Sequence, residues 1–268
     1  MLSAVATFAV FGAYAADTTI EQMPPRLEMQ YALSALSPAM RDQAAVYLLD
    51  PKSGYQLKRQ GTSGVTCLVE RTAWEQADFR NDIYVPLCYD AAGSKTYLKV
   101  IMDAAALRIQ GLRPAALKAE IEKRYREKTY QPPDKAGVSY MVAPVMRTWM
   151  LPDWQVHTMP MQHLMFYAPN LTDQDIGSGP SSFPGYPFVF KEGIPEQSYM
   201  IQFAGEAERA KIMADERPLL DELCAYREVL CVPHIQHWLN HVNLTFMHNG
   251  RAERPTIVSG EVIKEMLA

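Results

Sequence analysis

The first 25 residues contain no lysine and no arginine, and the first basic residue of the chain is Arg26. A signal peptide usually begins with a positive segment, which this N-terminus lacks. Residues 2–12 are nevertheless mainly apolar over the length of a signal-peptide core, and residues 13–15, Ala-Tyr-Ala, have the pattern of a cleavage site. We therefore expect residues 1–15 to be a signal peptide and the mature protein to be secreted or periplasmic. Two alternatives stay open: the chain starts a few codons upstream, or the apolar segment has another role.

The sequence also lacks a long hydrophobic run and a basic patch. A transmembrane helix needs about 20 apolar residues, so we expect no integral membrane segment after signal removal. The 26 basic residues are mixed with 30 acidic ones, for a net charge of −4, which excludes the basic footprint of a nucleic-acid-binding protein. A hydrophobic fraction of 48% indicates a globular chain. Its expected partner is a small molecule or another protein.

Motifs of the common catalytic classes are missing too. The chain has no G-x-S-x-G nucleophile elbow, no glycine-rich phosphate loop and no H-E-x-x-H motif. Acidic pairs such as Glu120 and Glu122 lie among basic residues, as on a solvated helix face. Glu70 and Arg71 end a predicted strand, so one of them must face inward or reach an edge. For Arg71, the alternatives are a structural ion pair and the binding of a ligand carboxylate.

Cysteine is rare, and its four copies form two sequence-local pairs. In an exported chain we expect disulfides. A Cys67–Cys88 bridge closes a loop of about 20 residues and stabilises the fold by ~3 kcal/mol. Within one continuous helix, Cys224 and Cys231 would lie about 10 Å apart, beyond disulfide reach; Pro233 indicates that the helix ends earlier, so this pairing stays open. No C-x2-C spacing supports a zinc site on thiolates.

Apolar periodicity, prolines and turn residues divide the chain into helices and strands. We expect an α+β fold in which an antiparallel sheet packs against helices. Its core domain spans residues 25–205, with a hinge at 131–134, and residues 206–268 form a helical C-terminal extension. The pattern predicts helices at 25–36, 94–110 and 114–130, a three-stranded antiparallel meander at 45–49, 55–59 and 64–71, further strands at 138–142, 164–168, 188–190 and 199–203, and a surface loop at 170–187.

The C-terminal part concentrates histidine. On a helix, His234, His237, His241 and His248 fall within a stripe about 60° wide. His237 and His241 have the H-x3-H spacing of a shared metal, and with His234 they form a candidate zinc site. The alternatives are a polar boundary beside the apolar face and a pH-sensitive interface.

A second candidate metal site lies in a segment of alternating histidine and methionine. On an extended chain, His157, Met159, Met161 and His163 point to one side. Thioether and imidazole ligands together suit copper. Against this, methionine is an ordinary core residue, and the chain contains 15 of them.

Five segments, at residues 31–36, 45–49, 61–71, 86–90 and 163–169, resemble a family of exported bacterial proteins whose activity is uncharacterised. The resemblance covers residues 27–205 and is carried by patterns such as G-T-x-G-x-x-C-x-V-x-R and H-L-M-F-Y-A-P. It implies export and one shared core, and it transfers no catalytic residue.

These observations leave three hypotheses for the function. The leading one is a non-catalytic accessory protein that binds a small ligand or a metal. The second is a metal-dependent hydrolase that uses His234, His237 and His241, with zinc or copper as the metal. The third is a structural or protein-interaction domain.

Overall fold

The computed structural model describes residues 19–150, 155–177, 187–190, 193–194 and 197–232, together with the short strands β11 (Met247–His248) and β12 (Arg251–Ala252). The predicted signal peptide at residues 1–15 lies outside the described residues. So do His234, His237 and His241 of the predicted zinc site. Within the described part of the chain, no helix is both long and apolar enough to cross a membrane.

The fold is α+β, as predicted, and is built on one eight-stranded sheet. Among the residues that the structure describes, every strand pairing in this sheet is antiparallel except that of β1 with β3. In spatial order the strands are β2 (Gly54–Arg59), β1 (Ala45–Asp50), β3 (Thr66–Glu70), β4 (Val85–Tyr89), β5 (Gly137–Met141), β8 (His163–Tyr167), β10 (Tyr199–Phe203) and β9 (Phe188–Phe190).

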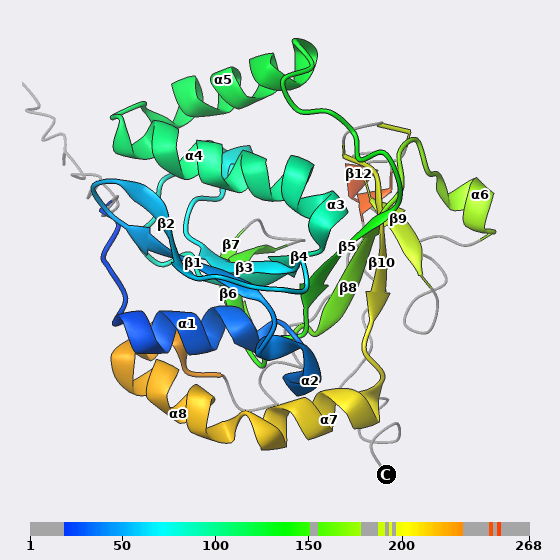
Figure 1. Cartoon of the computed structure of the whole chain (residues 1–268). Coiled ribbons are helices and arrows are strands. Elements are labelled where there is room, and N and C mark those ends of the chain that lie inside the picture. Colours follow the sequence, from blue (N-terminus) through cyan, green and yellow to red (C-terminus); the bar gives the residue numbers. More distant parts are fainter. Residues whose placement is uncertain are drawn as a thin grey trace, which may run out of the picture.

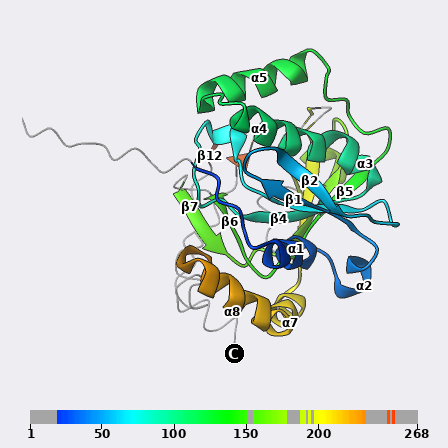
Figure 2. The same cartoon turned by 60° about the vertical axis from the view of Figure 1, so that its left-hand side comes forward.

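Helices cover both faces of this sheet (Figure 1). On one face lies α4 (Lys99–Ile109), with α5 (Pro114–Arg126) outside it, and on the other face lie α1 (Pro25–Ser34), α7 (Glu206–Asp215) and α8 (Arg217–Tyr226). The turned view in Figure 2 shows the same three layers. The shorter elements are α2 (Pro38–Arg41), η1 (Trp74–Gln76), α3 (Ala91–Gly93), η2 (Ser94–Leu98), α6 (Asp173–Ile176), η4 (Glu228–Leu230) and a separate pair, β6 (Met146–Met150) and β7 (Gln155–Met159).

The first three strands differ from the predicted meander. β1 and β2 form the expected antiparallel hairpin, whose turn has the Asp50 carboxylate accepting from the backbone of Lys52 and Ser53. β3, however, pairs parallel with β1. The connection after β2 passes across the start of β1, where a Cβ on Gly61 would lie 2.2 Å from the nitrogen of Ala45. Only glycine permits this crossing, which places β3 on the far side of β1.

The predicted hinge at residues 131–134 does not separate two halves. β4 and β5 lie on either side of it in sequence and are paired in the sheet, with Cys88 opposite Tyr140. Residues after 205 also contribute to the main core: Leu220 and Leu223 of α8 are buried in one cluster with Tyr31 of α1. The part of the C-terminal extension that the structure describes therefore covers the sheet.

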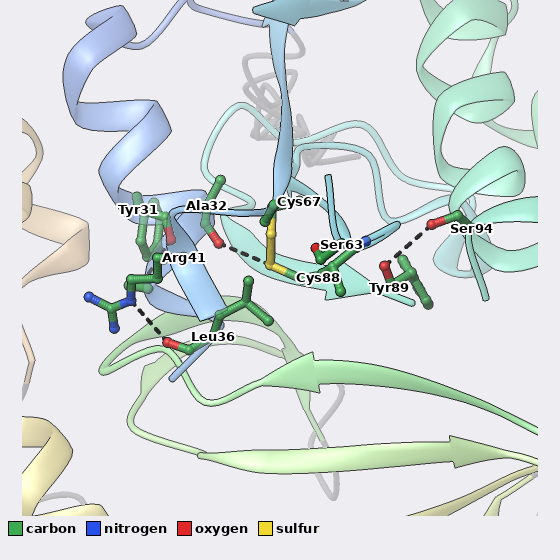
Figure 3. The surroundings of a disulfide bond; sticks show 12 residues. Tyr31, Ala32, Leu36, Arg41, Ser63, Cys67, Cys88, Tyr89 and Ser94 are labelled. Carbon is green, nitrogen blue, oxygen red and sulfur yellow. Dashed lines mark hydrogen bonds between the residues drawn. A yellow bond between two sulfur atoms is a disulfide. The ribbon is translucent and has the colours of Figure 1, made fainter. Parts of the chain in front are cut away.

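The expected Cys67–Cys88 pair is a disulfide in the structure, and so is the Cys224–Cys231 pair, which the sequence left open. Cys67 and Cys88 lie directly opposite each other on β3 and β4, and both are 0% exposed. The Cys88 sulfur lies 3.4 Å from the carbonyl oxygen of Ala32. This is a close contact, since a disulfide sulfur has no hydrogen to donate, and the two groups point toward each other (Figure 3). The bridge thus joins two strands directly beneath α1.

The second disulfide forms because α8 ends before Cys231. The helix stops at Tyr226, and the turn η4 brings the chain back, so that the Cα atoms of Cys224 and Cys231 are 4.4 Å apart. Leu230 of this turn is completely buried in the core, and the Arg227 guanidinium donates to the carbonyl oxygen of Asn81 at 2.9 Å. The loop is therefore fastened to the body of the protein.

Removal of the two disulfides should destabilise the protein unequally. Denatured-state chain entropy predicts a loss of ~3 kcal/mol for the C67A/C88A variant, whose loop spans 21 residues, and ~2 kcal/mol for C224A/C231A, whose loop spans 7. Guanidinium unfolding at 25 °C under non-reducing conditions measures both values. A greater loss for the shorter loop would contradict the entropic explanation.

Candidate functional site

The structure separates the four residues of the predicted copper site. β7 ends at Met159 and β8 begins at His163, and these strands belong to different sheets. His157 is exposed, whereas Met159 and His163 are buried. The expectation that all four share one face of an extended strand is wrong, because β7 ends at Met159 and residues 160–162 connect it to a strand of the other sheet.

The His163 ring is engaged by the backbone. Its Nδ1 lies 2.7 Å from the carbonyl oxygen of Met161, to which the Nδ1–H tautomer donates. Burial lowers the pKa of His163 to about 4, so the ring is neutral near pH 7. Among the described residues, no three His, Cys, Asp or Glu side chains gather as a metal site.

A cavity of about 350 Å³ lies between η1, α5 and the residues just before β10. We call it the Trp74–Tyr125 pocket. The two rings that name it have centroids 6.2 Å apart and are tilted by 34°. Its lining residues are Trp74, Glu75, Lys118, Glu122, Tyr125, Arg126 and Gln197.

The local sequence of α5 explains how this helix presents side chains to the pocket. Pro114 opens the helix at a position where a missing N–H costs nothing. Leu117 and Ile121 are completely buried and fix the side of α5 that faces the protein. Three charged residues spaced four positions apart lie on successive turns of α5 along the pocket: Lys118, Glu122 and Arg126.

The opposite wall of the pocket comes from η1. The Trp74 ring is 6% exposed and packs in a cluster with Leu117 and Ile121. Lys118 donates from Nζ to the carbonyl oxygen of Glu75 at 2.7 Å, which joins η1 to α5. The wall is thus fixed both by apolar packing and by a hydrogen bond.

Charges on α5 that lie outside the pocket are paired. Arg124 binds Glu120 at 3.0 Å and Asp103 of α4 at 2.9 Å. Lys123 lies 3.7 Å from Glu120 and 3.9 Å from Glu127. Glu120 is therefore the surface residue that the sequence predicted.

The four charged residues of the pocket are different. None of Glu75, Lys118, Glu122 and Arg126 forms an ion pair with any residue that the structure describes. Two are cations and two are anions. The sequence pattern placed Glu122 on a solvated helix face and did not predict that it lines a pocket. The opposite wall, formed by Trp74, comes from a segment more than 40 positions earlier in the sequence.

Glu70 lies on the α4-facing side of the sheet, opposite Val85 on β4. Its carboxyl group makes no hydrogen bond or ion pair within the described part of the chain. Burial raises the pKa of Glu70 well above its usual range, and the charge of Glu75 raises it further. Glu70 is therefore close enough to the pocket for the charge of one of its lining residues, Glu75, to raise its pKa.

Stacked tyrosines lie on the same side of the sheet. The ring centroids of Tyr97 and Tyr167 are 3.5 Å apart, and that of Tyr199 is 5.5 Å from Tyr167. Tyr97 belongs to η2, a π-helical turn, a feature common near functional sites. Burial raises the pKa of Tyr89, Tyr167 and Tyr199, so these hydroxyls stay protonated. They form a rigid neutral layer between the sheet and the π-helical turn.

Arg71 and Glu28 occupy the opposite, α1-facing side. Arg71, 3% exposed, donates from Nε to the carbonyl oxygen of Ile83 at 2.7 Å and from Nη2 to that of Asn81 at 3.0 Å. Backbone carbonyls, rather than a carboxylate of the protein or a ligand, therefore satisfy this cation. The Glu28 carboxylate accepts from the backbone N–H of Leu49 at 2.8 Å.

Comparison with protein-family models, curated proteins and solved structures finds no significant match to this chain.

The pH dependence of stability tests the environment of Glu28. Burial, the largest cause, raises its pKa to about 7, against 4.5 for an ordinary glutamate. A raised acid pKa stabilises the fold fully below pH 4.5, and this contribution is lost as the pH rises through 7. Between pH 4 and pH 8 the wild type should lose ~3 kcal/mol of unfolding free energy relative to Glu28→Gln.

Urea unfolding across this pH range measures the difference. Glutamine keeps an oxygen for the Leu49 N–H and removes the titration. Glu208→Gln, at an exposed position of α7, is the matched control and should follow the wild type. A constant difference between Glu28→Gln and the wild type at all pH values would contradict the prediction.

Proposed function

We propose that this protein is an exported binding protein that holds a small organic molecule in the Trp74–Tyr125 pocket. The observation that carries the proposal is the pocket's composition: two aromatic rings beside four charged side chains that have no ion-pair partner among the described residues. Ligand sites combine apolar walls with a few convergent polar groups in this way. The cavity volume of about 350 Å³ lies within the range of such sites.

Export is supported by two kinds of observation. The two disulfides are typical of proteins from oxidising compartments. The apolar N-terminal segment and the resemblance of residues 27–205 to exported bacterial proteins point the same way. The disulfides also make a rigid scaffold, which lowers the entropic cost of ligand binding.

The rigidity of the pocket supports binding as well. The Lys118–Glu75 hydrogen bond and the burial of Trp74 hold both walls before any ligand arrives. On the inner side of Tyr125, the edge of its ring meets the Tyr130 ring at a centroid distance of 4.9 Å. A preformed site of this kind loses little conformational entropy when it binds.

Binding at the pocket should depend on the charge of Glu122. Isothermal titration of the oxidised, mature protein against amino acids, monosaccharides, aromatic carboxylates and amines should identify a ligand. Glu122→Lys reverses a charge that lines the pocket and should weaken binding at least tenfold. Glu127→Lys makes the same change just beyond the end of α5, outside the pocket, and should bind as the wild type does.

Two results would contradict the proposed function. One is that no class of compound binds. The other is a ligand whose affinity is the same in Glu122→Lys and Glu127→Lys, because such a ligand occupies another part of the protein.

A further inference from the structure

We infer that the ligand of the Trp74–Tyr125 pocket is a small zwitterion with an apolar side chain, the chemistry of a free amino acid. This inference rests on the proposed function and specifies its ligand class. It follows from the order of the charges in the pocket, their lack of ion-pair partners and the rings beside them.

Charges of opposite sign alternate along one wall of the pocket. Lys118, Glu122 and Arg126 are four residues apart, so their positions advance by about 6 Å along the helix at each step. Glu122, the one carboxylate on this row, therefore has a cation on either side. A zwitterion presents an ammonium and a carboxylate to the protein at neighbouring points, and this wall offers the opposite charges at neighbouring points.

The second argument is the contrast within α5. The charged side chains outside the pocket, Glu120, Lys123 and Arg124, are used in ion pairs along the helix or with Asp103 of α4. Those that line the pocket are not paired with any described residue. One helix thus neutralises its charges on the outer surface and leaves both signs available at the cavity.

Lys118 is positioned without being neutralised. Its Nζ donates to the carbonyl oxygen of Glu75, which fixes the ammonium group at the pocket and leaves its full charge. An ammonium has three donors, so two remain for a ligand carboxylate. Glu75, opposite α5 on η1, adds a second carboxylate for a ligand ammonium.

The aromatic residues define the rest of the ligand. Tyr125 is half-buried and Trp74 lies behind it, so the pocket has an apolar wall next to its charged row. A cationic group of the ligand also gains from the face of such rings. A ligand with one charge, or with none, would cover some of the four charges without pairing them, which costs binding free energy.

Four phenyl compounds that differ only in charge test this inference by titration calorimetry. L-phenylalanine carries both charges, 3-phenylpropanoate the negative one, 2-phenylethylamine the positive one, and 2-phenylethanol none. The wild-type protein should bind phenylalanine about tenfold more tightly than either singly charged compound, a difference of ~1.4 kcal/mol each. The remaining standard L-amino acids, measured in parallel, establish which side chain fits best.

Two variants test which pocket residue binds which charge of the ligand. Two further variants make the same kind of change at neighbouring positions outside the pocket and serve as controls. Lys118→Met should bring phenylalanine and phenylethylamine to equal affinity while phenylalanine stays ahead of phenylpropanoate. Glu122→Gln should bring phenylalanine and phenylpropanoate to equal affinity, while phenylalanine still binds more tightly than phenylethylamine. Lys123→Met and Glu127→Gln change charges outside the pocket and should leave all ratios unchanged.

The outcomes separate this inference from the proposed function. One outcome is that phenylpropanoate, phenylethylamine or phenylethanol binds as tightly as phenylalanine and that Glu122→Lys still weakens its binding. The pocket is then a ligand site, and the inference that its ligand is a zwitterion is wrong. If none of the 20 standard L-amino acids binds while a sugar or another compound does, the inference is likewise overturned and the proposed function stands. If no class of compound binds, both the inference and the proposed function are contradicted.

Discussion

The connection between β3 and β4 is the constraint on which the rest of the structure depends. The Cys67–Cys88 disulfide closes it at its base, and its carbonyl groups are bound along its length by buried arginines. Arg71 donates to the carbonyl oxygens of Ile83 and Asn81, and its guanidinium lies 3.9 Å from the centroid of the Tyr84 ring. Arg108 of α4 donates to the backbone carbonyl oxygen of Arg71 at 3.0 Å. Buried cations without these partners would be costly. Trp74 and Glu75 lie within this connection, so the same interactions that satisfy its backbone also hold one wall of the pocket.

The two faces of the sheet carry different polar groups. The α1 face contains the disulfide, the Arg71 guanidinium and Glu28, and the last two bind backbone groups. The α4 face contains the stacked tyrosines and Glu70, whose carboxyl group has no partner among the described residues. The pocket that we propose as the ligand site lies on the α4 and α5 side, whereas the disulfide and the backbone partners of Arg71 and Glu28 lie on the α1 side.

Prediction from the sequence succeeded where the signal is local. Pro114 and the spacing of Leu117 and Ile121 predict the helix that becomes α5, and the turn residues at 50–54 predict the β1–β2 hairpin. It failed where distant segments decide the outcome. The parallel pairing of β1 with β3 depends on the path across Gly61, and the Met-His segment divides between two sheets after Met159, which alternation does not reveal. Glu120 and Glu122 looked equivalent in sequence, and only the neighbouring wall distinguishes them.

The sequence by itself determined the fold class, the Cys67–Cys88 pair and most helices and strands, because hydrophobic periodicity, capping residues and short loop closures act over a few residues. Tertiary structure alone decided the order of the strands, the partners of Arg71 and the existence of the pocket. These depend on contacts between segments that the sequence places far apart, such as Trp74 with Tyr125 and Cys88 with Tyr140. Such contacts follow from the packing of the whole chain around one sheet, which no local pattern encodes.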